Sequence, residues 1–300
     1  MPTSTASPDT GNSGMNWRYI LCMTALAALL AACSSGERST SRYSQAQDSA
    51  PHQAIDVSTV KDAVPRVEPK SRYGNPASYV VRGKRYNTLA SGKGYRKRGI
   101  ASWYGTKFHG HRTSSGEPYD MYGMSAAHKT LPLPTYARVS NLRNGRSVIV
   151  KINDRGPFHE NRIIDLSYAA ASRLGILGKG TGLVEVEAID PLIQEANKPP
   201  RSIPASQPKL SRPAATTTSG AQPALYLQLG AFSSRSNAER LQARLSSTEL
   251  PGKLRITETV SDQKPVFRVR IGPLANVETA DRLTRTLADQ GISSPRVVID

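Results

Sequence analysis

The middle of the chain alternates hydrophobic and polar positions in a way that predicts a β-hairpin. Two alternating runs flank the pair Asn144-Gly145, with hydrophobic residues at Val139, Val148, Val150 and Ile152. Such alternation is typical of strands with one buried face, and Asn-Gly favours a tight turn between two strands. A third alternating run, Leu183–Ile189, predicts another strand.

A short helix is predicted between these strands. The run Ile163–Leu166 reads as a strand and leads into the sequence YAAASRLG. Ser167 is a suitable N-cap, and Gly175 is a suitable end, because glycine adopts the left-handed conformation that often ends a helix. Many short strands with little helix indicate a small barrel from about Gly99 to Asp190.

The C-terminal segment, 224–300, contains an internal repeat. Tyr226–Gly230 and Phe267–Gly272 read as strands, and an amphipathic helix follows each of them. Two more strand candidates, 254–260 and 296–299, complete the order β-α-β-β-α-β, which is typical of a ferredoxin-like α+β domain. Ser236 and Glu239 have the spacing of a capping box for the first helix, and Asn276 is a suitable cap for the second.

Strand alternation also predicts which face of this small domain is free. The leucines at 225, 227 and 229 share one face and are expected to meet the helices. The opposite face carries Tyr226, Gln228, Arg268 and Arg270, a polar and aromatic set suited to binding a glycan. An RNA-binding sheet of this topology has stacked aromatic residues where these arginines stand. We therefore expect no nucleic-acid partner.

The N-terminus reads as a signal peptide, 1–32, in which Met15 is a possible true start. A mostly apolar run follows Arg18 and is too short to span a bilayer. Cys33 follows Leu30-Ala31-Ala32, an arrangement that resembles a bacterial lipobox, and Cys22 is the only other cysteine. Lipidation of Cys33 would give a stable anchor. The alternative is an ordinary signal peptide with Cys33 as a bystander.

Composition predicts two spacers. Residues 33–72 are rich in Ser, Gln, Asp, Pro and Lys and read as a lipidated N-terminus with a flexible tether. Residues 191–223 read as a Pro/Ser/Thr-rich linker. The segment 73–190 then holds the barrel with an N-terminal extension. The net charge of +17 favours a polyanionic partner, but nucleic acid, acidic lipid and wall glycan all fit it.

Four sequence blocks resemble the rare lipoprotein A family. They are GIASWYGTKFHGHRTSSGEPYD, SAAHKTLPLPTYARVSN, VIVKINDRGPF and IIDLSYAAASRLG, in order and well spaced. The C-terminal repeat resembles a SPOR domain, a family of modules that bind peptide-stripped peptidoglycan at division septa. The resemblance implies a double-psi β-barrel that acts as a lytic transglycosylase on wall glycan. It implies no cofactor.

The resemblance also implies three catalytic residues, Glu117, His128 and Asp154. Asp154 follows a strand and precedes a Gly-Pro turn, a suitable place for the acid that glycosidic cleavage needs. Its alternative is a turn residue that forms an ion pair with Arg155 or caps the turn as an Asx residue. Glu117 lies in a Ser/Gly-rich loop and is otherwise a solvated carboxylate. His128 is expected to orient a carboxylate or the substrate, or else to be structural.

Further residues are candidates for holding the glycan. Trp103 and Tyr104 can stack on sugar rings, although strand alternation lets at most one of them point outward. Arg155 is a candidate partner for the carboxylate of muramic acid, together with Lys107, Arg112, Lys129 and Arg138, which are otherwise a solvated basic surface. No metal site is expected, because His128 has no second histidine at ligand spacing and His109 and His111 flank a glycine in a basic loop.

The expected protein is therefore a lipid-anchored enzyme on the periplasmic face of the outer membrane, enriched at the division septum. Ser34 favours sorting to the outer membrane, since an aspartate there would resemble a signal for retention in the inner membrane. The expected partners are peptidoglycan glycan strands, the membrane and possible septal proteins. The alternative function is a non-catalytic lipoprotein that only binds septal peptidoglycan.

Overall fold

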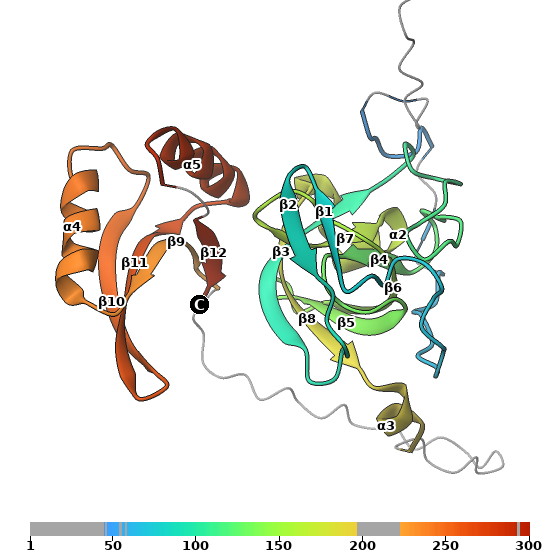
Figure 1. Ribbon diagram of the computed structural model, residues 1–300. Helices are drawn as coiled ribbons and strands as arrows, with labels where there is room; N and C mark the ends of the chain where they lie inside the picture. Colours follow the sequence, from blue (N-terminus) through green and yellow to red (C-terminus); the bar gives the residue numbers. More distant parts are fainter. Residues whose placement is uncertain (1–44, 46, 54–55, 58, 197–222, 293–294) are drawn as a thin grey trace, which may run out of the picture. The chain divides into compact units, whose positions relative to one another are not determined.

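The computed structural model describes residues 45, 47–53, 56–57, 59–196, 223–292 and 295–300. The predicted signal peptide, Cys33 and most of the predicted linker lie outside these residues. The described residues form two folded regions, 45–196 and 223–300 (Figure 1). None of the helices in the described ranges is long and apolar enough to cross a bilayer.

The first region is built around a closed six-stranded barrel with the strand order β3-β7-β4-β6-β5-β8. The pairs β3–β7 and β4–β6 are parallel, and the other neighbours are antiparallel. This topology confirms the expected double-psi β-barrel. The strands are β3 (Arg96–Tyr104), β4 (Ser125–His128), β5 (Thr135–Asn141), β6 (Ser147–Asp154), β7 (Arg162–Ser167) and β8 (Gly182–Ile189).

The predicted hairpin forms from β5 and β6. Val139 pairs with Val148, and both are buried in the core, as their place in the alternating pattern requires. Gly145 in the connecting turn has a φ of 71°, a conformation that favours glycine. The hairpin places its turn at one end of β6 and Asp154 at the other.

The predicted helix is α2 (Tyr168–Leu174). Ser167 caps it by accepting a hydrogen bond from the backbone N–H of Ala170, and Gly175 ends it with a φ of 74°. Its alanines are buried against the barrel. A short 3-10 turn, η1 (Leu177–Lys179), then leads into β8.

A strap, residues 45–95, packs along the barrel and corrects the prediction of a flexible tether that reaches residue 72. Val57 is 6% exposed and belongs to the barrel core. The backbone N–H of Ala63 donates to the carbonyl of Ile149, and Asp62 pairs with Arg173 at 2.8 Å. Composition did not predict this packing, because the part of the strap up to residue 72 has few apolar residues and no sustained strand or helix periodicity. Near its end the strap forms a hairpin of β1 (Ser78–Val81) and β2 (Lys84–Asn87).

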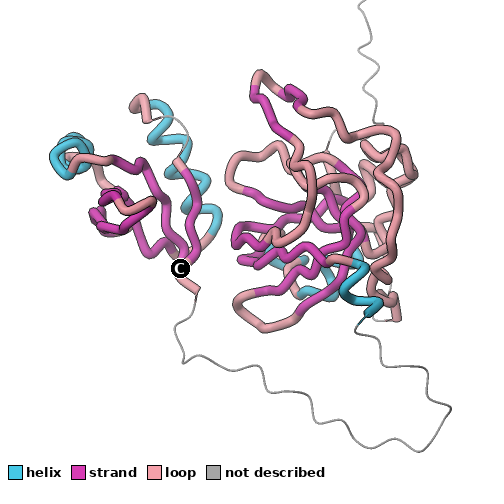
Figure 2. The backbone as a smooth tube through the Cα atoms, turned by 60° about the horizontal axis from the view of Figure 1, so that its bottom comes forward, coloured by secondary structure: helices cyan, strands magenta, loops and turns pink. Residues whose placement is uncertain are grey.

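The second region has the predicted β-α-β-β-α-β order. Its four-stranded sheet has the order β10-β11-β9-β12. Figure 2 shows its helices and strands in cyan and magenta. The elements are β9 (Leu225–Phe232), α4 (Arg235–Leu245), β10 (Lys253–Ser261), β11 (Lys264–Leu274), α5 (Val277–Asp289) and β12 (Arg296–Ile299).

Burial in this sheet follows the predicted alternation. The leucines at 225, 227 and 229 are buried, whereas Gln228, Arg268 and Arg270 are partly exposed. Asn276 caps α5, since its side chain accepts from the N–H of Thr279 at 2.8 Å.

Two local predictions at the linker and at α4 were wrong. The cap position of α4 is Ser234, so the capping box predicted for Ser236 and Glu239 does not form, and Glu239 instead pairs with Arg235 at 2.9 Å. The first residues of the predicted linker form the short helix α3 (Pro191–Ala196). Proline is favoured in the first turn of a helix, and Asp190 accepts from the N–H of Leu192 there.

Candidate active site

Asp154 lies at the end of β6 and is held by the loop that carries Glu117. Its Oδ1 accepts hydrogen bonds from the backbone N–H of Ser114 at 2.7 Å and from the Ser114 hydroxyl at 2.6 Å. The backbone N–H of Arg155 donates to the same oxygen at 2.7 Å. The carboxyl is partly exposed and fixed in orientation by a loop 40 residues away in sequence. The ion pair with the Arg155 side chain, one of the two structural alternatives, does not form, whereas the bond from the Arg155 N–H is a local contact of the kind that the other alternative, a turn cap, expects.

Glu117 is joined to β6 beside Asp154. Its Oε2 accepts from the Asn153 amide at 2.8 Å, and its Oε1 pairs with Lys151 at 2.8 Å. Partial burial by itself raises the pKa of Glu117, but the hydrogen bonds from Asn153 and Lys151 and the charge of Lys151 bring the pKa below its usual value. Glu117 therefore carries a negative charge at neutral pH.

The strap contributes to the same cluster through Glu68. Lys151 also pairs with Glu68 Oε2 at 3.0 Å and thus bridges two carboxylates. The hydroxyl of Tyr136 donates to the other oxygen of Glu68. Glu68 was missed because composition assigned it to the tether.

Both ring nitrogens of His128 bond to groups other than the two carboxylates. The ring is 2% exposed, and its Nδ1 accepts from the backbone N–H groups of Thr130 and Leu131. Nε2 therefore carries the proton and donates to the Tyr95 hydroxyl at 2.9 Å. Burial, aided by the charge of Arg155, lowers the pKa of His128 to about 3. The contacts of His128 are therefore those of the structural alternative and not of a residue that orients a carboxylate or the substrate. It is a neutral histidine that stabilises the turn after β4.

Arg155 also has a structural position instead of the predicted contact with substrate. Its guanidinium donates to the carbonyls of Gly74, His128 and Leu131 and to the side chain of Asn75. The side chain thereby ties the loop after Asp154 to the strap. Sequence spacing gives no sign of this contact, because Gly74 lies 81 residues away.

The pair Trp103 and Tyr104 follows the predicted alternation. Tyr104 is buried and stacks on Tyr119, with ring centroids 4.0 Å apart. Trp103 is partly exposed and lies edge-on to Tyr168. Trp103 thus stays a candidate for contact with sugar, whereas Tyr104 belongs to the core.

Asp165 is a third carboxyl near the site, and sequence reasoning missed it. Asp154 on β6 and Asp165 on β7 both pair with Ala127, from opposite sides of β4. The Ser102 hydroxyl donates to Asp165, and burial raises the pKa of the carboxyl. A charged residue inside the hydrophobic run IIDL is the signal that would have found it.

Two hollows flank the Glu117–Lys151 pair. One, of about 710 Å³, is lined by Glu117 and its loop together with Arg72 and Tyr73 of the strap. The other, of about 400 Å³, is lined by Lys151, Asn153 and Ser125, among others. Within the described ranges, no cluster of three His, Cys, Asp or Glu side chains has the arrangement of a metal site.

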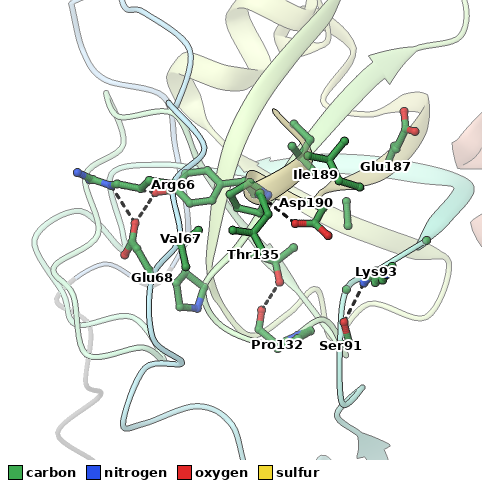
Figure 3. A pocket seen from close by; sticks show the side chains of 18 of the residues that line it. Arg66, Val67, Glu68, Ser91, Lys93, Pro132, Thr135, Glu187, Ile189 and Asp190 are labelled. Carbon is green, nitrogen blue, oxygen red and sulfur yellow. Dashed lines mark hydrogen bonds and ion pairs between the residues drawn. The ribbon is translucent and has the colours of Figure 1, made fainter. Parts of the chain in front are cut away.

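A larger pocket, of about 880 Å³, lies between the strap and the ends of β5 and β8 (Figure 3). Arg66, Lys93 and Glu187 are among the side chains that line it. None of the three predicted catalytic residues lines this pocket. We therefore place the site at the hollow that Glu117 and its loop line, beside the end of β6 that carries Asp154.

In the C-terminal domain, the predicted glycan-binding residues share one sheet face. Gln228 pairs in register with Arg270 on β11 and with Arg296 on β12. Arg270 is additionally paired with Asp300 at 3.0 Å. Arg268 stands opposite Ala231 and leaves its guanidinium at a partly exposed position.

Comparison with known proteins agrees with this architecture. Residues 96–186 match the family described as lytic transglycolase, and residues 221–297 match the SPOR domain. The chain is 41% identical to the endolytic peptidoglycan transglycosylase RlpA of Pseudomonas aeruginosa, over 93% of this chain and 95% of that one. The chain belongs to the RlpA family.

Other RlpA proteins give the same result. The endolytic peptidoglycan transglycosylase RlpA of Vibrio cholerae is 40% identical over 92% of this chain and 93% of its own. The crystal structure of the RlpA SPOR domain from Pseudomonas aeruginosa covers 25% of this chain and 96% of that chain, with 32% identity and a TM-score of 0.24. The two RlpA relatives each match more than nine tenths of this chain, so the matches include both of its folded regions.

Proposed function

We propose that this RlpA chain is an endolytic peptidoglycan transglycosylase that cleaves the bond between MurNAc and GlcNAc and leaves 1,6-anhydro-MurNAc ends. The observation that carries the proposal is the reciprocal hydrogen bonding between the Glu117 loop, which lines the hollow of about 710 Å³, and the end of β6 that carries Asp154. Ser114, in the Glu117 loop, holds Asp154, and Asn153, next to Asp154, holds Glu117. Family membership and the names of the relatives support the same activity.

In the proposed reaction, Asp154 protonates the glycosidic oxygen as the bond from the MurNAc anomeric carbon to that oxygen breaks. The C6 hydroxyl of the same MurNAc then forms the new bond to the anomeric carbon, and its proton passes to Asp154. Atoms balance without water, and the carboxyl returns to its starting state. A second carboxylate need not act as a nucleophile.

Glu117 has a different proposed role. It is kept ionised by Lys151 and Asn153, so it is suited to stabilise the positive charge that develops at the anomeric carbon. Its loop lines the hollow, so a sugar lying there would be within reach of this charge.

The test is digestion of purified, peptide-free sacculi followed by analysis of the soluble products. Wild-type protein should release 1,6-anhydro products, and Asp154→Asn should lower their release by at least about 100-fold, the scale of a lost general acid. Asp120→Asn is a matched control, because Asp120 is an exposed aspartate in the loop after Glu117 whose main hydrogen bond, from the N–H of Tyr122, an asparagine can keep.

Intact glycan after incubation with folded wild-type protein contradicts the proposal. Pelleting of that protein with the sacculi would then favour the alternative, a lipoprotein that only binds peptidoglycan. An Asp154→Asn variant with full activity would leave the reaction in place but remove Asp154 from its proposed role.

We further propose that Cys33 carries the lipid anchor, that the protein lies on the periplasmic face of the outer membrane, and that the SPOR domain concentrates it at the septum. The lipobox-like sequence before Cys33, the absence of aspartate at Ser34 and the SPOR match support this. Labelling with a radioactive fatty acid should mark wild type and not Cys33→Ser. Septal fluorescence of a tagged chain should disappear when residues 221–300 are deleted.

A further inference from the structure

Tyr73 is an exposed aromatic side chain on a fixed backbone. Its side chain is among the most exposed large hydrophobic groups, with 60% of the residue surface accessible. The residues on both sides are bonded to the barrel. The Ser71 N–H and the Asn75 amide donate to the Leu133 carbonyl, and the Gly74 carbonyl accepts from Arg155 at 2.8 Å. An aromatic ring held in this way loses little conformational entropy when it binds a ligand.

The ring lies beside the loop that carries Glu117. Gly116 has a φ of 95°, and a Cβ built there would come within 3.4 Å of the Tyr73 ring. Tyr73 and Glu117 line the same hollow of about 710 Å³. The strap therefore supplies one wall of the hollow and the Glu117 loop supplies another.

Arg72 adds a positive charge to this wall. Its guanidinium carbon lies 5.5 Å from the centre of the Tyr73 ring. Among the described residues, Arg72 makes no ion pair with a carboxylate, in contrast to Lys151 and Arg173. With the guanidinium over one face of the ring, the charge and the rest of the aromatic surface together can bind a ligand that carries both a carboxylate and an apolar ring face.

We propose that Arg72 and Tyr73 form a subsite for a muramic acid residue, in which Tyr73 stacks on the pyranose and Arg72 pairs with the lactyl carboxylate. The inference rests on the proposed function, since it names part of the substrate of that same site. Both residues precede the stretch 96–186 that matches the lytic transglycolase family.

The subsite predicts how the barrel distinguishes peptide-free glycan. When a stem peptide is attached, the lactyl carboxylate is an amide and carries no charge. When the peptide has been removed, the carboxylate is free to pair with Arg72. The barrel would then favour peptide-free strands by itself, in addition to any preference of the SPOR domain.

The experiment compares two soluble glycans, one peptide-free with free lactyl carboxylates and one whose carboxylates have been converted to neutral methylamides. Release of 1,6-anhydro products is measured for the full chain. For wild type, kcat/KM should fall about tenfold on amidation, the scale of one charge-assisted hydrogen bond. Arg72→Ala should be about tenfold slower than wild type on the free carboxylate and show no further loss on the amide. Tyr73→Ala should lose a similar factor on both glycans.

Arg143→Ala is the matched control. It also removes one exposed arginine, but it lies in the β5–β6 turn, at the opposite end of β6 from Asp154. It should keep the wild-type response to amidation. Equal responses of Arg72→Ala and wild type to amidation would overturn the subsite.

A second readout does not depend on cleavage. In NMR spectra of the full chain, the amide signals of Tyr73 and Gly116 should shift when a peptide-free glycan fragment is added, and Arg72→Ala should weaken this response. If the wild type cleaves nothing while these signals shift, the proposed function fails and the subsite stands. If the wild type cleaves while the signals stay unchanged, the subsite fails and the function stands.

Discussion

At the scale of single residues, His128 shows how burial decides what a histidine does. Both ring nitrogens are used within the fold, by Tyr95 on one side and by the backbone of Thr130 and Leu131 on the other. The folded pKa of about 3 lies below the unfolded value of about 6.5. As the pH falls below that unfolded value, the unfolded chain binds a proton that the folded chain does not, so stability is lost.

The expected result is a loss of about 1.4 kcal/mol in unfolding free energy for each pH unit between about 6.5 and 3 from this group. Urea unfolding of wild type and His128→Asn at several pH values measures it, because asparagine keeps an acceptor but does not titrate. The exposed His52→Asn serves as control and should behave like wild type. Parallel pH curves for wild type and His128→Asn would contradict the prediction.

Asp165 gives a prediction of the opposite kind. Burial raises the pKa of its carboxyl above the unfolded value, so its contribution to stability is present at low pH and lost as the pH rises through the folded pKa. Asp165→Asn should therefore unfold at a higher temperature than wild type at pH 7, and the gain should vanish below about pH 4. Thermal unfolding, followed by circular dichroism at pH 7 and below about pH 4, measures the difference in unfolding temperature between the two proteins. A gain that persists at low pH would point to a cause other than the charge.

At the scale of elements, the caps of the two helices in the C-terminal domain show that residue spacing predicts a helix start in one case and fails in the other. Asn276 caps α5 with its side chain, whereas Ser236, which has equally suitable spacing, lies inside α4. Capping-box spacing alone does not fix where a helix begins, since the turn after β9 decides which serine takes the cap position.

Asn276→Ala should destabilise the SPOR domain by about 1 kcal/mol, the usual effect of losing an N-cap. Ser236→Ala should change its stability by no more than a few tenths of a kcal/mol, because Ser236 is exposed and caps nothing. Hydrogen exchange of the buried β9 amides in the full chain measures both. Equal effects of the two substitutions would contradict the assignment of the caps.

At the scale of the whole molecule, the strap makes the folded unit larger than the matched barrel. It buries Val57 in the barrel core and brings Glu68 to Lys151 and Tyr73 to the Glu117 loop. Stability and substrate binding are therefore expected to depend on the same segment.

A chain that begins at Gln45 should keep the stability of the barrel, whereas one that begins at Tyr73 should lose at least about 2 kcal/mol, the scale of exposing one buried valine. Urea unfolding of both chains measures the difference. Equal stability of the two chains would show that the strap adds nothing to the barrel. The chain that begins at Tyr73 also lacks Glu68 and Arg72. Its activity should therefore be lower than that of the longer chain even at urea concentrations at which it is still folded.

The sequence by itself determined the hairpin of β5 and β6, the helix α2 with both of its ends, and the buried faces of β9 and β11. These features depend on alternation, on capping residues and on turn glycines, which act over a few positions. Family resemblance added the barrel and the residues Glu117 and Asp154. Only the tertiary structure decided that His128 and Arg155 serve the fold, and that the strap takes part in the site. Those outcomes depend on contacts between segments up to 83 residues apart, such as Glu68 with Lys151, which no local pattern encodes.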